Sequence, residues 1–271
     1  MIAELRRVAR VPAVRAILTS PRVEPIVATV LRASPVSRLA AFLAREVRPP
    51  ADPKGYRLRG SSAVVFIRHR TPDVAALGEV FYERQYEPPQ PVAERLASLG
   101  RPLRILDLGA NVGLFGVFAM ETFAGATLTA VEPDPANLRL LLRTMHANSW
   151  SWEVVEAAVT NADGQVPFAT GRFTTSRIEP GGDLVTTVDA LPRLEAADFA
   201  KIDIEGGEWT ILDDPRLATV GTAAIILEYH PYLCPSEDPL GHASARLASA
   251  GYRLLPSIEF ERGHGMLWAW R

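Results

Sequence analysis

The sequence predicts an α/β fold built on a doubly wound, mostly parallel sheet of seven strands, with helices on both faces. Three observations lead to this fold class. They are a strand, glycine turn and helix at residues 104–120, an alternation of apolar runs and helical segments over residues 126–250, and a closing pair of strands after residue 251. Strands that alternate with helices pair in parallel through helical crossovers, and a closing hairpin adds one antiparallel strand.

The first fifty residues form an arginine-rich segment with nine Arg and three Glu. Two or three short amphipathic helices are predicted, for instance at residues 2–17 and 35–47, and the proline-rich residues 49–53 form a linker. We therefore expect an N-terminal helical extension at residues 1–55 and a larger domain at residues 56–271. The extension is a packing arm or lid, or else a surface helix that meets an acidic membrane or a carrier protein. Prolines that interrupt its apolar face favour the packing arm.

The remaining elements follow from hydrophobic periodicity and capping residues. Strands are predicted at residues 63–68, 104–108, 126–131, 153–159, 199–204, 223–229, 252–255 and 266–270. Helices are predicted at residues 73–86, 92–99, 112–120, 135–148, 208–212 and 239–250. Asp134 as N-cap and Pro135 in the first turn mark one helix start clearly. Residues 160–188 are turn-rich, with short β-runs.

Composition narrows the class of protein. The chain has 271 residues, of which 48% are hydrophobic, and this is enough for one domain with a sizeable core plus an extension. Its formal charge of −2 gives no reason to expect a nucleic-acid partner. Cys234 is the single cysteine, so an internal disulfide is impossible. No apolar run reaches the length of a membrane span, and we expect a cytoplasmic protein without a transmembrane segment.

The glycine turn after the first core strand is the strongest local signal. Nucleotide-like ligands bind at such a turn because the backbone and a helix N-terminus can approach them closely. Here the order is Asp107, Gly109, Asn111 and Gly113, so an acid precedes the first glycine and the middle glycine of a dinucleotide fingerprint is absent. A carboxylate repels a pyrophosphate but suits an amino group, which favours S-adenosylmethionine over NAD. The alternative is a plain structural corner.

Glu132 stands at the end of the second strand of the predicted sheet, roughly 20 residues beyond the turn. An acidic side chain at this position accepts hydrogen bonds from both ribose hydroxyls of a bound nucleoside. The alternative is an acid next to a helix cap that is exposed to water. Together with the turn, Glu132 favours the ribose interpretation.

A second distinctive stretch, Lys-Ile-Asp-Ile-Glu-Gly-Gly-Glu, occupies residues 201–208. In a strand, Lys201, Asp203 and Glu205 share one face, where three charges are unfavourable unless they are paired or lie at the open edge of the sheet. Asp203 and Glu205 fall at the carboxyl end, where ligands bind. The alternative is a paired structural network around Lys201, one of only two lysines in the chain.

Glu228 and His230 end the next strand and share a face beside these acids. His230 titrates near neutrality and is the first candidate for the base that takes a proton from a hydroxyl. Asp203, Glu228 and His230 also form a ligand set for a divalent metal. Nothing in their spacing demands one, so no metal is expected. The remaining histidines are expected to be structural; they are His69, His146, His242 and His264.

Taken together, these motifs resemble the FkbM family of S-adenosylmethionine-dependent methyltransferases. The resemblance runs from about residue 66 to residue 231. It rests on the motifs at residues 106–113, 131–135, 157–159, 187–189, 201–208 and 227–230. The departures are Gly-Gly-Glu at residues 206–208, where Gly-Ala-Glu is frequent, and Val188, where leucine is frequent. The first fifty residues match no segment of the family.

The resemblance implies a class I methyltransferase (Rossmann-like) fold with S-adenosylmethionine as the cofactor. The implied cofactor-binding residues are Asp107, Gly109, Ala110, Asn111, Gly113, Glu132, Asp134 and Ala158. The implied reaction is in-line methyl transfer to a hydroxyl of a small molecule, such as a natural product or a sugar-like acceptor.

Within that reaction we expect His230 or Asp203 to act as base. Glu205 and Lys201 shape the acceptor pocket, and Glu228 completes the catalytic set. A small-molecule acceptor is the expected partner, and a homodimer is left open. Two rivals share the fold: an NAD-dependent oxidoreductase and a non-catalytic scaffold in a biosynthetic complex.

Overall fold

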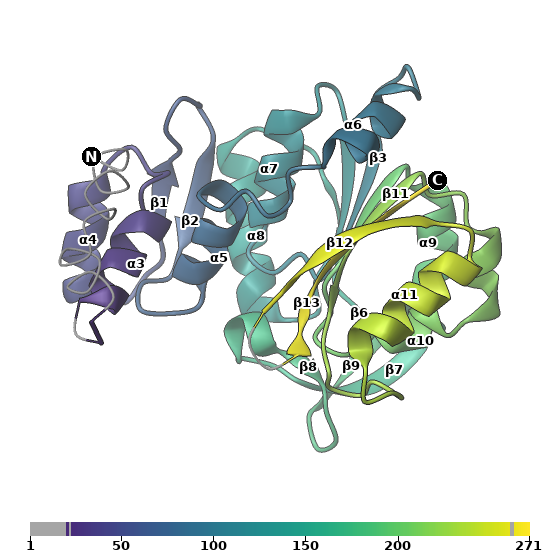
Figure 1. Ribbon diagram of the computed structural model, residues 1–271. Helices are drawn as coiled ribbons and strands as arrows, with labels where there is room; N and C mark the ends of the chain where they lie inside the picture. Colours follow the sequence, from purple (N-terminus) through teal and green to yellow (C-terminus); the bar gives the residue numbers. More distant parts are fainter. Residues whose placement is uncertain (1–19, 22, 261–262) are drawn as a thin grey trace. The chain divides into compact units, whose positions relative to one another are not determined.

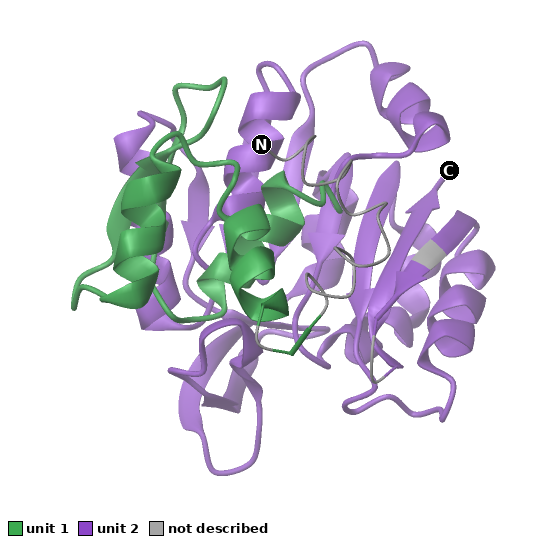
Figure 2. Ribbon diagram, turned by 60° about the vertical axis from the view of Figure 1, so that its left-hand side comes forward, with its two compact units in different colours: residues 1–85 green, residues 86–271 purple. Residues whose placement is uncertain are grey.

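A computed structural model of the protein describes residues 20, 21, 23–260 and 263–271 (Figure 1). The chain divides into two compact units, Met1–Gln85 and Tyr86–Arg271 (Figure 2). The helix predicted at residues 2–17 lies outside the described residues. The boundary predicted after residue 55 falls inside strand β1 (Lys54–Arg57), whose antiparallel pairing with β2 (Val64–Ile67) joins it to the rest of the first unit. A division into independently folding domains stays a prediction.

The first unit combines this β-hairpin with three helices. They are α3 (Glu24–Arg32), α4 (Leu39–Val47) and α5 (Asp73–Phe81). Helix α3 packs closely on α5 because Gly78 has no side chain; a Cβ there would overlap the side chain of Arg32. Asp73 begins α5 and accepts hydrogen bonds from the backbone and guanidinium of Arg68. The buried residues of this unit include Phe42, which packs against Tyr56.

The second unit is organised around a seven-stranded sheet with the order β12-β13-β11-β10-β3-β4-β5 (Figure 1). Its strands are β3 (Arg104–Leu108), β4 (Thr127–Val131), β5 (Glu153–Val155), β10 (Phe199–Ile202), β11 (Ala224–Tyr229), β12 (Arg253–Glu259) and β13 (Gly265–Trp270). The strands from β5 to β11 are parallel, and β13 is antiparallel to both of its neighbours. The predicted doubly wound sheet with an antiparallel C-terminal strand is confirmed.

Helices cover both faces of this sheet. Helices α7 (Leu114–Thr122) and α8 (Pro135–Ala147) lie on one side, and α9 (Ala190–Ala196), α10 (Glu208–Leu212) and α11 (Pro239–Ser249) lie on the other (Figure 1). Helix α6 (Gln90–Ala97) precedes β3. Because neighbouring strand residues face opposite sides, Leu106 and Ile202 join the core beneath α9–α11. Phe199 packs on Phe115 of α7 on the other face.

One predicted strand is wrong. Residues 153–159 form two strands, because the chain turns at residues 156–157, where the Ala157 amide bonds back to the Val155 carbonyl. After the turn, β6 (Ala158–Thr160) enters a second sheet with the order β6-β9-β7-β8. The other strands of that sheet are β7 (Gly164–Ala169), β8 (Arg177–Ile178) and β9 (Asp183–Asp189). The turn-rich segment therefore carries more regular structure than the sequence indicates.

A search of the described part of the chain finds no helix with the length and apolar character needed to cross a membrane.

Candidate active site

The glycine turn forms a tight corner between β3 and α7. Gly109, Asn111 and Gly113 all have positive φ values, of 80°, 49° and 84°. Gly109 is required here for a second reason: a Cβ on it would overlap the carbonyl oxygen of Asp203. The corner after β3 therefore packs backbone to backbone against the segment that follows β10. This contact places the two distinctive motifs side by side at the carboxyl ends of β3 and β10.

Glu132 supports this corner from the end of β4. Its carboxylate accepts hydrogen bonds from the amides of Asn111 at 2.8 Å and Asp134 at 2.9 Å, and from the side chain of Asn137 at 3.3 Å. Burial raises the pKa of Glu132 to about 7, against the opposing effect of these donors. A carboxylate has about four lone-pair sites, so three donors leave it with room for one more.

These features fit an adenosyl ligand. The spare acceptor site of Glu132 suits a ribose hydroxyl, and the buried side-chain oxygen of Asn111 has no hydrogen-bond partner among the described residues. Ala110 is buried within the same corner. Ala158 is also buried; it begins β6 and pairs with Thr187 of β9, and its role in cofactor binding stays a prediction.

Asp134 is the N-cap of α8, as predicted, and accepts hydrogen bonds from the amides of Ala136 and Asn137. It also accepts from the Gly171 amide at 2.6 Å and the Ser176 hydroxyl at 3.0 Å. Burial alone would raise the pKa of Asp134, but these donors outweigh it and the pKa is lowered. Asp134 thus ties the segment between β7 and β8 to the corner.

Lys201 lies directly beside Asp107, because parallel pairing of β10 with β3 puts the two residues in register. Its Nζ is 3.3 Å from Asp107 Oδ1 and 3.2 Å from Asp203 Oδ2, and it donates to the Gly109 carbonyl at 2.9 Å. Burial would lower the pKa of Lys201, but the carboxylates of Asp107, Asp203 and Glu228 outweigh burial and raise it. Lys201 therefore forms the paired network of the alternative interpretation, with a side chain only 5% exposed.

Asp107 depends on this lysine. Its side chain is fully buried, and neither carboxylate oxygen has a hydrogen bond from any described residue. Burial raises the pKa of Asp107, and the Lys201 ammonium opposes that rise. Asp107 is therefore an internal counter-charge beneath the corner.

His230 lies among acids. Its Nδ1 is 3.1 Å from Glu208 Oε1, and its Nε2 is 3.6 Å from Glu205 Oε2 and 3.8 Å from Glu228 Oε1. Burial would lower the pKa of His230, but the acids, Glu208 first, raise it to about 10. The ring is therefore an imidazolium at neutral pH. For Glu205 burial is the stronger effect. It raises the pKa of Glu205 to about 7, and the charge of His230 offsets only part of this rise.

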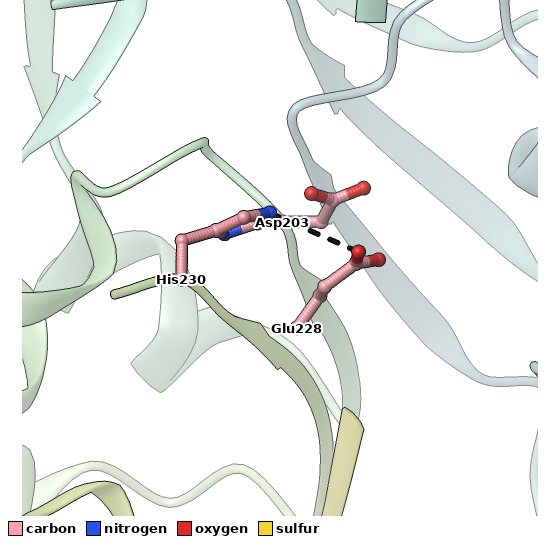
Figure 3. Close-up of side chains that lie close together, drawn as sticks. All are labelled: Asp203, Glu228 and His230. Carbon is pink, nitrogen blue, oxygen red and sulfur yellow. Dashed lines mark ion pairs between the residues drawn. The ribbon is translucent and has the colours of Figure 1, made fainter. Parts of the chain in front are cut away.

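Asp203, Glu228 and His230 converge at the carboxyl ends of β10 and β11 (Figure 3). Each offers one atom within 4.8 Å of the other two, which is a spacing that suits a divalent cation. The Glu228 carboxylate also pairs with the imidazolium in the same cluster. The expectation of no metal stays a prediction.

Glu208 is the residue of this site that sequence reasoning missed. It is fully buried at the start of α10 and accepts from the backbone amides of His230 at 2.6 Å and Gly206 at 2.8 Å. It thereby holds the ring and the Gly206 turn together. Its position directly after two glycines at a helix start was the available signal, because a carboxylate there faces unpaired backbone amides.

Two more residues near His230 also went unrecognised. The ring of His264, which was expected to be structural, lies parallel to that of His230 with centroids 6.1 Å apart. Arg177 of β8 lies over the ring of Tyr232, 4.1 Å from its centroid, and its charge lowers the pKa of Glu205. The second sheet therefore contributes a cation beside the acidic cluster.

One family model covers both the glycine corner and the acidic motif around His230. Residues 107–254, more than half of the chain, match the family model of the methyltransferase FkbM domain. The chain belongs to the FkbM methyltransferase family. The matched region begins at Asp107 and ends within β12, so it includes both the glycine corner and the His230 cluster.

FkbM-family membership rests on this domain match. A curated relative, the type II methyltransferase M.XamI of Xanthomonas campestris pv. amaranthicola, is 43% identical over 56 residues, which is 21% of this chain and 11% of that protein. The chain thus matches only a small part of that relative's length.

Solved structures show weaker likeness. Precorrin-6y C5,15-methyltransferase of Geobacter metallireducens GS-15 aligns at TM-score 0.38 and 19% identity, covering 66% of this chain and 87% of that one. Magnesium protoporphyrin IX methyltransferase of Synechocystis PCC 6803 aligns at TM-score 0.40 and 14% identity, covering 72% and 83%.

Proposed function

We propose that this FkbM-family protein transfers a methyl group from S-adenosylmethionine to a hydroxyl oxygen of a small molecule, such as a natural product or a sugar-like acceptor. The observation that carries the proposal is the contact between the two motifs. The backbone of Gly109 packs on the carbonyl of Asp203, two residues before Glu205. A donor site at the glycine corner would therefore lie next to ionisable groups that can handle the acceptor's proton.

The donor would be held by the corner and by Glu132. When bound, S-adenosylmethionine supplies a methyl group on a positively charged sulfur. Glu132 offers its remaining acceptor site to the ribose, and Gly109 and Gly113 keep the approach free of side chains. Methyl transfer of this kind depends mainly on alignment and exclusion of water, which a buried corner favours.

We propose that Glu205 is the general base that accepts the proton of the acceptor hydroxyl. A general base works best when its pKa is close to the operating pH, and that of Glu205 is about 7. Its side chain is 22% exposed, so an acceptor can reach it. His230, with a pKa of about 10, is already protonated and serves to hold Glu205 and Glu228 in place. This division of roles differs from the sequence-based expectation that His230 is the first proton acceptor.

The assay measures methyl transfer from radiolabelled donor to a panel of hydroxylated small molecules. Mass spectrometry of the product then shows whether the methyl group is attached to oxygen or to nitrogen. In the Glu205→Gln variant we expect turnover to fall by about 10²- to 10⁴-fold. We expect its affinity for S-adenosylhomocysteine to stay within about twofold, because the Glu205 carboxylate pairs with the His230 ring. The matched control is Glu121→Gln, which changes an exposed acid in the last turn of α7, at the end of the helix away from the glycine corner.

Three results would count against the proposal. Transfer only to nitrogen or carbon acceptors would overturn the oxygen assignment. Equal loss of turnover in both variants would overturn the role of Glu205. Donor binding without transfer to any acceptor would favour a scaffold.

A further inference from the structure

The first compact unit contains a hollow of about 500 Å³ that is lined by α4, the two residues before it and strand β1. Backbone hydrogen bonding joins the segment before α4 to β1, since the Ser37 amide donates to the Arg57 carbonyl at 2.9 Å. An antiparallel bridge between Val36 and Leu58 reinforces the contact. The volume is within the range of small-molecule sites.

Three arginines line this hollow: Arg38, Arg45 and Arg57. The described lining includes no acidic side chain. Arg38 and Arg57 are exposed, and the side chain of neither makes a hydrogen bond or ion pair with the described residues. Three like charges around one hollow repel each other, and the repulsion is relieved when an anion binds between them.

Arg45 is held in place by a buried chain of hydrogen bonds. Its guanidinium donates to the Tyr56 hydroxyl at 2.9 Å, and that hydroxyl is 2.6 Å from His69 Nε2. The other ring nitrogen, His69 Nδ1, is 2.5 Å from Glu46 Oε1. Tyr56 and His69 are 4% and 7% exposed. A guanidinium anchored through this chain, in which Tyr56 and His69 are buried and Glu46 is partly buried, loses little freedom on binding a ligand.

We propose that this hollow is a binding site for the phosphate group of a small phosphate monoester, with Arg45 as the anchored donor and Arg38 and Arg57 as the groups that close on the anion. A phosphate monoester carries nearly two negative charges at neutral pH and three acceptor oxygens, which match several guanidinium forks. The volume leaves space for the rest of a small molecule beside the phosphate. The site lies within the first unit and does not depend on the proposed methyl transfer.

The test is isothermal titration of the full-length protein with inorganic phosphate, glucose 6-phosphate and glucose. We expect both phosphate compounds to bind, with glucose 6-phosphate tighter, and glucose not to bind. The double variant R38A/R57A removes two exposed side chains, so we expect an unchanged melting temperature and a loss in phosphate affinity of about tenfold or more. The control is Arg48→Ala, an exposed arginine at the end of α4 that does not line the hollow.

Several outcomes would overturn the proposal. They are no binding of either phosphate compound at tens of millimolar, an equal loss of affinity in the Arg48 control, or unchanged affinity in the double variant. Vesicles of phosphatidylcholine with phosphatidic acid distinguish the source of the phosphate. Binding to these vesicles without binding of glucose 6-phosphate would point to a membrane surface and against a small-molecule site.

Discussion

Replacing Lys201 with methionine tests the charged pair beneath the glycine corner. Methionine keeps the length of the side chain but removes the ammonium, leaving the fully buried Asp107 without any partner for its two oxygens. Asp107 must then take up a proton in the folded state, although it ionises near pH 3.9 when unfolded. At pH 7 this costs about 4 kcal/mol, from roughly three pH units at about 1.4 kcal/mol each.

This argument also fixes the pH dependence. In the variant, the folded state binds one proton more than the unfolded state above about pH 4, so the free energy of unfolding falls by about 1.4 kcal/mol per pH unit. In the wild-type protein the Lys201 ammonium opposes the rise in the pKa of Asp107, so we expect this pair to give a shallower slope between pH 5 and 8 than the variant does. Urea denaturation followed by tryptophan fluorescence at pH 5, 6, 7 and 8 measures both quantities.

The control is the double variant K201M/D107N, in which Asp107 is replaced by a neutral amide that cannot titrate. We expect the slope added by Lys201→Met to disappear and part of the stability to return, because the double variant no longer buries a carboxyl group without its cation. A loss below about 1 kcal/mol in Lys201→Met, or a loss that is the same at pH 5 and pH 8, would refute the pairing.

Two further predictions concern residues at the carboxyl ends of the central strands. Gly109→Ala is expected to lower the free energy of unfolding by about 3 kcal/mol or more, because its Cβ overlaps the Asp203 carbonyl at a positive φ. Gly100→Ala, where φ is also positive but no atom lies within 4 Å, is expected to lose only about 1 kcal/mol in the same denaturation assay; equal losses would contradict the close approach. By NMR, the ring of His230 is expected to titrate near pH 10, and at lower pH in Glu205→Gln. Titration near the ordinary value of 6.5 would contradict the ion cluster.

Much of the second unit could be predicted from the sequence because its signals are local. The Asp107 to Gly113 spacing specified the corner, and the strand of residues 199–204 and the helix at residues 208–212 were placed almost as they occur. The break after Val155 was missed because the apolar run continues through it, and periodicity does not record a change of sheet.

Contacts that depend on pairing between distant segments could not be predicted. The sequence gives no sign that Lys201 meets Asp107, since this follows from the pairing of β10 with β3. For the same reason the pKa of His230 was misjudged, because Glu208 reaches the ring only after α10 has folded back onto β11. The domain match confirms the family suspected from the motifs, while the assignment of each site residue stays a prediction.

The most direct test of the account is calorimetric titration with S-adenosylhomocysteine. The wild-type protein is expected to bind it, and Glu132→Ala is expected to bind at least about tenfold more weakly. The variant loses the acceptor for the ribose, which contributes about 1.5–3 kcal/mol, and also the hydrogen bonds that support the corner. The control Glu121→Ala is expected to bind as the wild type does. No binding by the folded wild-type protein, or equal affinity in all three proteins, would contradict the central claim that the corner after β3 holds the adenosyl donor.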